Sequence, residues 1–173
     1  MPRFSAGAAT AVVASLVVSG YVASASGPVI PADRALKVEV LSRGWIDGGS
    51  VDGRLRMVPA AAFRLTNVSR TTLRAVQVNA LFDGSGLDRN GFGGAWAGLD
   101  VGGGLRPGAS IVTPLLRSQG GYVGVPEAAR VDPVRFRQLP IEEATVRLFA
   151  RCESDHWRRV AEVPIARTLL SPR

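Results

Sequence analysis

Cys152 and His156 are the single cysteine and the single histidine of the chain, and they lie four residues apart. Across a turn, this spacing could bring a thiolate and an imidazole together as a nucleophile and its base. A zinc site needs three or four nitrogen or sulfur ligands, which this pair cannot supply. Apolar residues alternate up to Cys152 and place its side chain on the core face, so we expect an inert, buried thiol.

The segment 83–91 carries side-chain oxygens at short spacing, as a calcium-binding loop does. It lacks the ligand order and the distal glutamate of such a loop, and Asx turns among glycines explain it equally well. The same glycines lack the spacing of a phosphate-binding loop. Glu142 and Glu143 are expected to be solvated at the start of a strand. We therefore predict no catalytic residue, no metal and no cofactor.

Residues 83–104 form a glycine-rich stretch that carries three large apolar side chains, Leu87, Phe92 and Trp96. Such side chains on a flexible loop can dock onto a partner, and they can equally fold back and cap the domain. We take these three as the candidate partner-binding residues. The alternative is a glycan or anionic-polymer site that uses Trp96, Tyr122 and neighbouring arginines.

The chain is basic, with 21 Lys+Arg against 14 Asp+Glu and a formal net charge of +7. Nearly all of the positive charge is arginine, and it is scattered from Arg34 to Arg173. A nucleic-acid binder usually gathers its cations on one face or one helix. The scatter argues against nucleic acid as a partner and leaves an anionic surface open.

Residues 1–25 have the pattern of a cleavable signal peptide. Arg3 supplies the positive start, 6–18 is an apolar run without charge, and Ala23–Ala25 offers small residues for cleavage. We expect export to the periplasm or the cell exterior, with 26–35 as a flexible start of the mature chain. The alternative is an uncleaved segment that continues to Val29 and anchors an accessory protein in the membrane.

Apolar and polar residues alternate along several segments of 36–173, which is the period of strands with one buried face. In the clearest of these, Leu73–Phe82, alternation places four side chains in the core: Val76, Val78, Ala80 and Phe82. Other strands are expected at 36–45, 55–66, 96–101, 110–116, 145–151 and 157–166, with a turn at 47–50. The chain at 119–140 is expected to be irregular, with one helical turn near 127–130. Pro59 is expected at a bulge or a sheet edge.

About seven strands without an internal repeat predict an all-β fold, an Ig-like antiparallel sandwich of two sheets. We expect it to form a single domain over 36–173, with 83–104 as a glycine-rich insertion.

Residues 63–116 contain Phe63–Ser69 before the strand that ends in Phe82-Asp83, followed by the turn Leu105–Gly108. This pattern resembles the FxLYD-type domains of exported bacterial proteins, although Asn79 stands where the leading phenylalanine is expected. The resemblance covers about a third of the chain. It implies a β-sandwich outside the cytoplasm and no shared catalytic residue.

These observations lead to one functional expectation. The chain is expected to be a non-enzymatic binding or assembly module of the cell envelope, which acts on a protein partner through its sheet edges and the 83–104 stretch.

Overall fold

The computed structural model describes residues 30–84, 92–99, 101–141, 143–153 and 155–170. The signal segment 1–25 therefore lies outside the described residues. Within them, no helix is long and apolar enough to cross a membrane. The elements, in chain order, are α1 (Ala32–Ala35), β1 (Leu36–Val51), β2 (Arg54–Asn67), β3 (Gln77–Gly84), β4 (Gly93–Gly98), β5 (Ser110–Val112), β6 (Leu116–Arg117), β7 (Tyr122–Val123), α2 (Glu127–Val131), α3 (Pro133–Gln138), β8 (Ala144–Arg151) and β9 (Arg158–Pro164).

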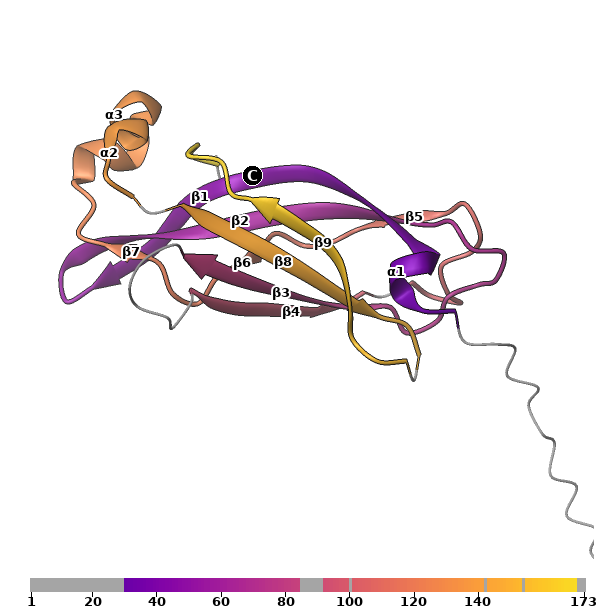
Figure 1. The fold of residues 1–173 in the computed structure, drawn as a ribbon. Coiled ribbons are helices and arrows are strands. Elements are labelled where there is room, and N and C mark those ends of the chain that lie inside the picture. The colour runs from indigo at the N-terminus through magenta and orange to yellow at the C-terminus, as the bar shows by residue number, and fades with distance from the viewer. Residues whose placement is uncertain (1–29, 85–91, 100, 142, 154, 171–173) are drawn as a thin grey trace, which may run out of the picture.

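The strands form two antiparallel sheets that face each other (Figure 1). In the first sheet, β2 pairs with β1 on one side and with the short strands β5, β6 and β7 on the other. The second sheet has the order β4-β3-β8-β9. The predicted all-β, two-sheet sandwich is confirmed. The described residues contain more strands than expected, because the predicted strand at 110–116 is split into β5 and β6 and β7 follows it.

The core lies between the sheets and follows the predicted alternation. Val76, Val78, Ala80 and Phe82 are at most 1% exposed, as expected for their face of the chain. The facing positions of β8, Val146, Leu148 and Ala150, are buried as well, and so is Cys152 directly after the strand. Burial of this apolar surface is the main term that favours folding, since the single cysteine cannot form an intramolecular disulfide.

Helices α2 and α3 lie together at one end of the sandwich, and α1 lies at the other (Figure 1). Asp132 caps α3 by accepting hydrogen bonds from the backbone N–H groups of Val134 and Arg135. Phe136 of α3 is 1% exposed, and its ring centroid lies 6.3 Å from that of the buried Trp45. The helical turn expected at 127–130 is present as α2, whereas the second helix, α3, which covers the core at Trp45, was not expected.

The predicted turn at 47–50 was also wrong. Strand β1 continues to Val51, and its register with β2 shifts between Asp47 and Ser50. The Asp47 carboxylate accepts a hydrogen bond from the Gly49 N–H, and Gly49 has a φ of 82°. These residues therefore form a bulge inside the strand. The chain reverses at Asp52 and Gly53, whose φ values of 49° and 73° suit a tight hairpin turn.

Strand β3 begins at Gln77, later than the predicted start at Leu73. Leu73 makes only an isolated bridge to Leu105, and Ala75 has a φ of 48°. A left-handed residue cannot continue an extended strand, so the change of direction at Ala75 delays the start of β3.

Pro59 lies in the central strand β2, opposite Trp45, so its predicted place at a bulge or an edge was wrong. The Pro59 carbonyl accepts a hydrogen bond from the N–H of Ser118, which lies between β6 and β7. The nitrogen of Pro59 faces the same side, where the neighbouring strand is interrupted. The missing N–H therefore costs no ladder hydrogen bond.

The expected flexible start at 26–35 is partly helical. Ala32 and Ala35 of α1 are fully buried against the core, so this part of the segment is packed. At the other end of the chain, Leu169 forms a parallel bridge with Trp45 of β1. The Trp45 N–H donates to the Thr168 carbonyl, and the Leu170 N–H donates to the Trp45 carbonyl, each at 2.8 Å.

Asn67, at the end of β2, joins two turns. Its side-chain amide donates to the carbonyls of Thr71 at 2.7 Å and Leu105 at 2.8 Å. Its side-chain oxygen accepts from the N–H and the hydroxyl of Ser69 at 2.9 and 2.7 Å. The side chain is fully buried. The segment Asn67–Ser69 and the turn Leu105–Gly108 are therefore held together by the side chain of Asn67.

Candidate functional site

Part of the predicted glycine-rich insertion is a strand of the second sheet. β4 pairs with β3 from the Gly93–Phe82 pair to the Gly98–Gln77 pair, and it begins three residues before the predicted strand 96–101. Ala95 and Ala97 pack against the core, so removal of this strand would open the sandwich. The stretch 83–104 is therefore not an appendage that can be deleted without effect on the fold.

The three candidate partner-binding residues, Leu87, Phe92 and Trp96, do not lie together on one surface that the structure describes. Phe92 folds back: it is partly buried against the core, and its ring meets Trp45 edge-on with centroids 5.9 Å apart. The Phe92 carbonyl also accepts hydrogen bonds from the Gly120 N–H and the Ser118 hydroxyl. Trp96 is 62% exposed in β4. Leu87 lies outside the described residues.

Trp96 stands on the outer face of the second sheet, since Ala95 and Ala97 on either side of it face the core. Asn79 of β3 and Phe149 of β8 follow it in the same cross-strand row. In the adjacent row, the Arg151 guanidinium donates to the Gln77 side-chain oxygen at 2.6 Å and lies 5.0 Å from the centre of the Trp157 ring. This face therefore combines aromatic side chains with an arginine that has no carboxylate partner among the described residues.

The two edges of the second sheet differ in chemistry. At the β9 edge stand Arg158, Arg159 and Glu162, and the strand ends at Pro164. Charges and proline are the usual means by which an edge strand avoids pairing with another chain. Strand β4, with the sequence Gly-Gly-Ala-Trp-Ala-Gly, has neither. The edge at β4 is therefore the one that is chemically open to a partner.

Tyr122, the other aromatic residue considered for a glycan site, lies in β7 of the first sheet. It is partly buried against the core and pairs with Met57 of β2. The structure therefore does not bring Tyr122 together with Trp96.

Cys152 is 3% exposed, and burial, followed by the nearby charges of Asp155 and Glu153, raises the pKa of its thiol to about 11. A thiol in this state is a poor nucleophile at neutral pH. His156 is exposed in the turn after it. Among the described residues, no three His, Cys, Asp or Glu side chains come together as a metal site.

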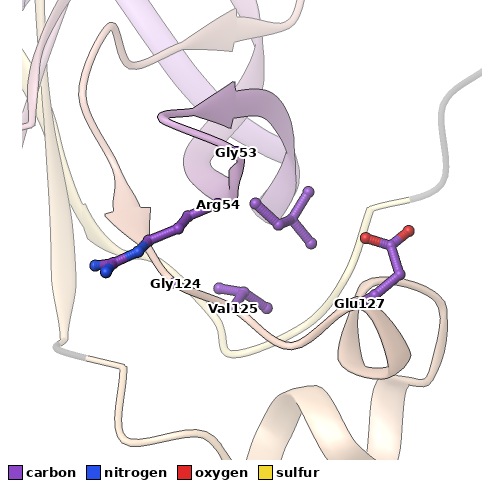
Figure 2. A pocket seen from close by; sticks show the side chains of 6 residues that line it. Gly53, Arg54, Gly124, Val125 and Glu127 are labelled. Atoms are coloured by element: carbon purple, nitrogen blue, oxygen red, sulfur yellow. The ribbon is translucent and has the colours of Figure 1, made fainter.

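The hollow in Figure 2 has a volume of about 460 Å³ and lies between the β1–β2 hairpin and the start of α2. Arg54 and Glu127 line it, and their side chains point apart. Glu127 is paired with Arg130 at 3.0 Å. Because its charged groups do not converge on one point, this hollow has no arrangement suited to catalysis.

No protein-family description and no curated protein matches this chain. Among solved structures, it is similar to an X-ray structure of a Northeast Structural Genomics Consortium target, with a TM-score of 0.40 and 12% identity over 78% of this chain and 84% of that one. It is also similar to a Bordetella pertussis protein provisionally named ApaA, with a TM-score of 0.39 and 19% identity over 76% of this chain and 88% of that one.

Proposed function

We propose that this protein is an exported, non-enzymatic binding module of the cell envelope that holds a protein partner at β4. The observation that carries the proposal is Trp96, a large aromatic side chain that is 62% exposed on an uncharged edge strand. Tryptophan is enriched among the residues that dominate binding energy at protein interfaces. The signal-peptide pattern of residues 1–25 and the resemblance of 63–116 to FxLYD-type domains support a place outside the cytoplasm.

The experiment compares two tryptophan variants. Wild type, Trp96→Ala and Trp157→Ala are expressed with their own signal segment, cross-linked in whole cells and purified from envelope fractions. Trp157 is a matched control because it is also exposed, at 36%, and directly precedes β9 of the same sheet. We expect one cross-linked protein partner with wild type and Trp157→Ala, and its loss with Trp96→Ala. Equal recovery from all three proteins would refute a role for Trp96.

An anionic envelope polymer is a second candidate ligand, because one hollow is lined by arginines. Arg56 and Arg117 line a hollow of about 310 Å³. The Arg56 guanidinium donates only to the carbonyls of Gly48 and Gln119, so its charge is not neutralised by an ion pair among the described residues. Titration with an acidic polysaccharide at low and high salt tests this candidate. Arg117→Gln is expected to weaken salt-sensitive binding of the polysaccharide. No binding of the polysaccharide at low salt would exclude it as the ligand.

A further inference from the structure

The backbone of β4 presents a set of outward-facing hydrogen-bonding groups. The Leu99 N–H donates to the Val76 carbonyl at 3.0 Å, which fixes the phase of the ladder between β4 and β3. In an antiparallel ladder, successive residues point to opposite sides, so Gly94, Trp96 and Gly98 direct their N–H and C=O groups away from β3. Among the described residues, none of these outward groups has a backbone partner.

The outer side of β1 is covered around Trp45, and the far side of β2 carries three short strands. The segment Thr168–Leu170 bonds to β1 on both sides of Trp45. The strands along the far side of β2 are only two or three residues long. β4 is six residues long. It thus has the length that strand addition requires, and Trp96 and Gly98, whose outward groups would pair, are exposed, while β6 of the other sheet lies close to this strand.

The surroundings of β4 favour an acidic occupant. Beyond Gly98, a hollow of about 490 Å³ is lined by Arg74, Leu99 and Val101. Arg74 is exposed, and its guanidinium forms no ion pair with a described residue. Two acidic residues of this stretch, Asp88 and Asp100, lie outside the described residues. The formal net charge of +7 would steer an acidic segment toward the chain and repel a second copy.

We infer that β4 binds an extended acidic segment of another protein as an added strand. The segment pairs with the backbone of Gly94, Trp96 and Gly98, lies beside the Trp96 ring, and places a carboxylate in the Arg74 hollow. This inference rests on the proposed function and names the chemistry and the binding mode of the partner.

Gly98 allows a sharp test of backbone pairing. A Cβ at this position would meet the Trp96 ring at 3.6 Å, which is ordinary contact, so the site accepts side chains. The change Gly98→Pro removes an outward N–H without a loss of pairing to β3, whereas Gly98→Ala keeps the N–H and is the matched control. If the proline variant does not fold, the pair Gly98→Glu and Gly98→Lys tests the site instead, because the two variants place opposite charges at the same position.

The probes are two peptides of seven residues, one in which glutamate alternates with valine and one in which lysine replaces glutamate. We expect only the acidic peptide to bind, and to slow amide hydrogen exchange at Gly94, Trp96 and Gly98. Gly98→Pro and Gly98→Glu are expected to weaken binding about tenfold or more, with Gly98→Ala near wild type and Gly98→Lys tighter. Arg74→Gln is expected to weaken binding severalfold, and the exposed Arg54→Gln is its control.

Three results would overturn the inference: no binding of the acidic peptide, equal binding of both peptides, or equal binding to Gly98→Pro and Gly98→Ala. A wild-type dimer in sedimentation that Gly98→Pro abolishes would instead identify a second copy as the occupant. An envelope partner that is lost with Trp96→Ala but kept with Gly98→Pro would preserve the proposed function and refute strand addition. Peptide binding as expected, without any envelope partner, would support strand addition at β4 and refute the proposed function.

Discussion

Replacement of Asn67 by alanine removes the side chain that joins the 67–71 segment to the 105–108 turn. The amide donates two hydrogen bonds to carbonyls, at 2.7 and 2.8 Å, and its oxygen accepts two from Ser69. The alanine variant loses all four bonds at a fully buried position. The Leu105 carbonyl then keeps only the Leu73 N–H as a donor, the Thr71 carbonyl keeps only the Ser69 hydroxyl, and the Ser69 N–H loses its acceptor. The expected effect is therefore a large loss of folding stability.

The magnitude follows from the individual bonds. A hydrogen bond contributes about 1 kcal/mol net, so four would contribute about 4 kcal/mol. Ser69 is partly solvated and its hydroxyl also reaches the Thr71 carbonyl at 3.1 Å, so part of this loss is recovered. We expect Asn67→Ala to lower the free energy of unfolding by about 3 kcal/mol, which corresponds to roughly 6–12 °C in melting temperature.

Urea unfolding, followed by circular dichroism, measures this difference. Asn67→Asp is an informative companion, because it keeps the acceptor oxygen but turns a carboxylate toward the Thr71 and Leu105 carbonyls, so we expect an equal or larger loss. Thr66→Ala, which removes an exposed hydroxyl contact to Ser110, is the control and should cost less than about 1 kcal/mol. A loss below about 1 kcal/mol for Asn67→Ala would show that Asn67 does not hold the two turns.

Two further predictions concern the interior. Because the pKa of Cys152 is raised from 9.0 to about 11, the folded state favours the neutral thiol, so this contribution to stability is complete below pH 9 and is lost as the pH rises toward 11. Urea midpoints across this range should fall less for Cys152→Ala, and an identical fall in both proteins would contradict the assignment. A Cβ on Gly121 would overlap the Met57 carbonyl oxygen, so Gly121→Ala should cost about 2 kcal/mol in thermal unfolding. Gly103→Ala, which meets open space, should be neutral, and similar melting temperatures for the two variants would refute the argument.

The sequence predicted the sheet faces well, because burial on one side of a strand imposes a period of two. That period placed Val78 and Phe82 of β3, Leu148 of β8 and Cys152 just after β8 on the buried face. The ends of the strands were harder to predict, because single residues decide them. Glycine and aspartate at 47–50 suggested a turn, yet the Asp52-Gly53 pair, a stronger hairpin signal, forms the actual reversal.

The candidate site was predicted only in part. An aromatic side chain on a glycine-rich stretch can turn either way, and the sequence could not separate Phe92, which packs on Trp45, from Trp96, which faces solvent. Alternation of Ala95 and Ala97 with Gly94, Trp96 and Gly98 is the signal that could have identified a strand with one buried face here. The Asp132-Pro133 pair likewise carried a helix-start signal for α3.

The bonds between Thr168–Leu170 and Trp45 have a practical meaning for anyone who engineers this chain. The tail shields the border of β1 by occupying the amide and the carbonyl of Trp45. A truncation upstream of Thr168 would expose the backbone of β1 at Trp45 and favour aggregation during purification. Affinity tags and fusion partners are therefore better attached before α1, where they do not disturb the bonds between Thr168–Leu170 and Trp45.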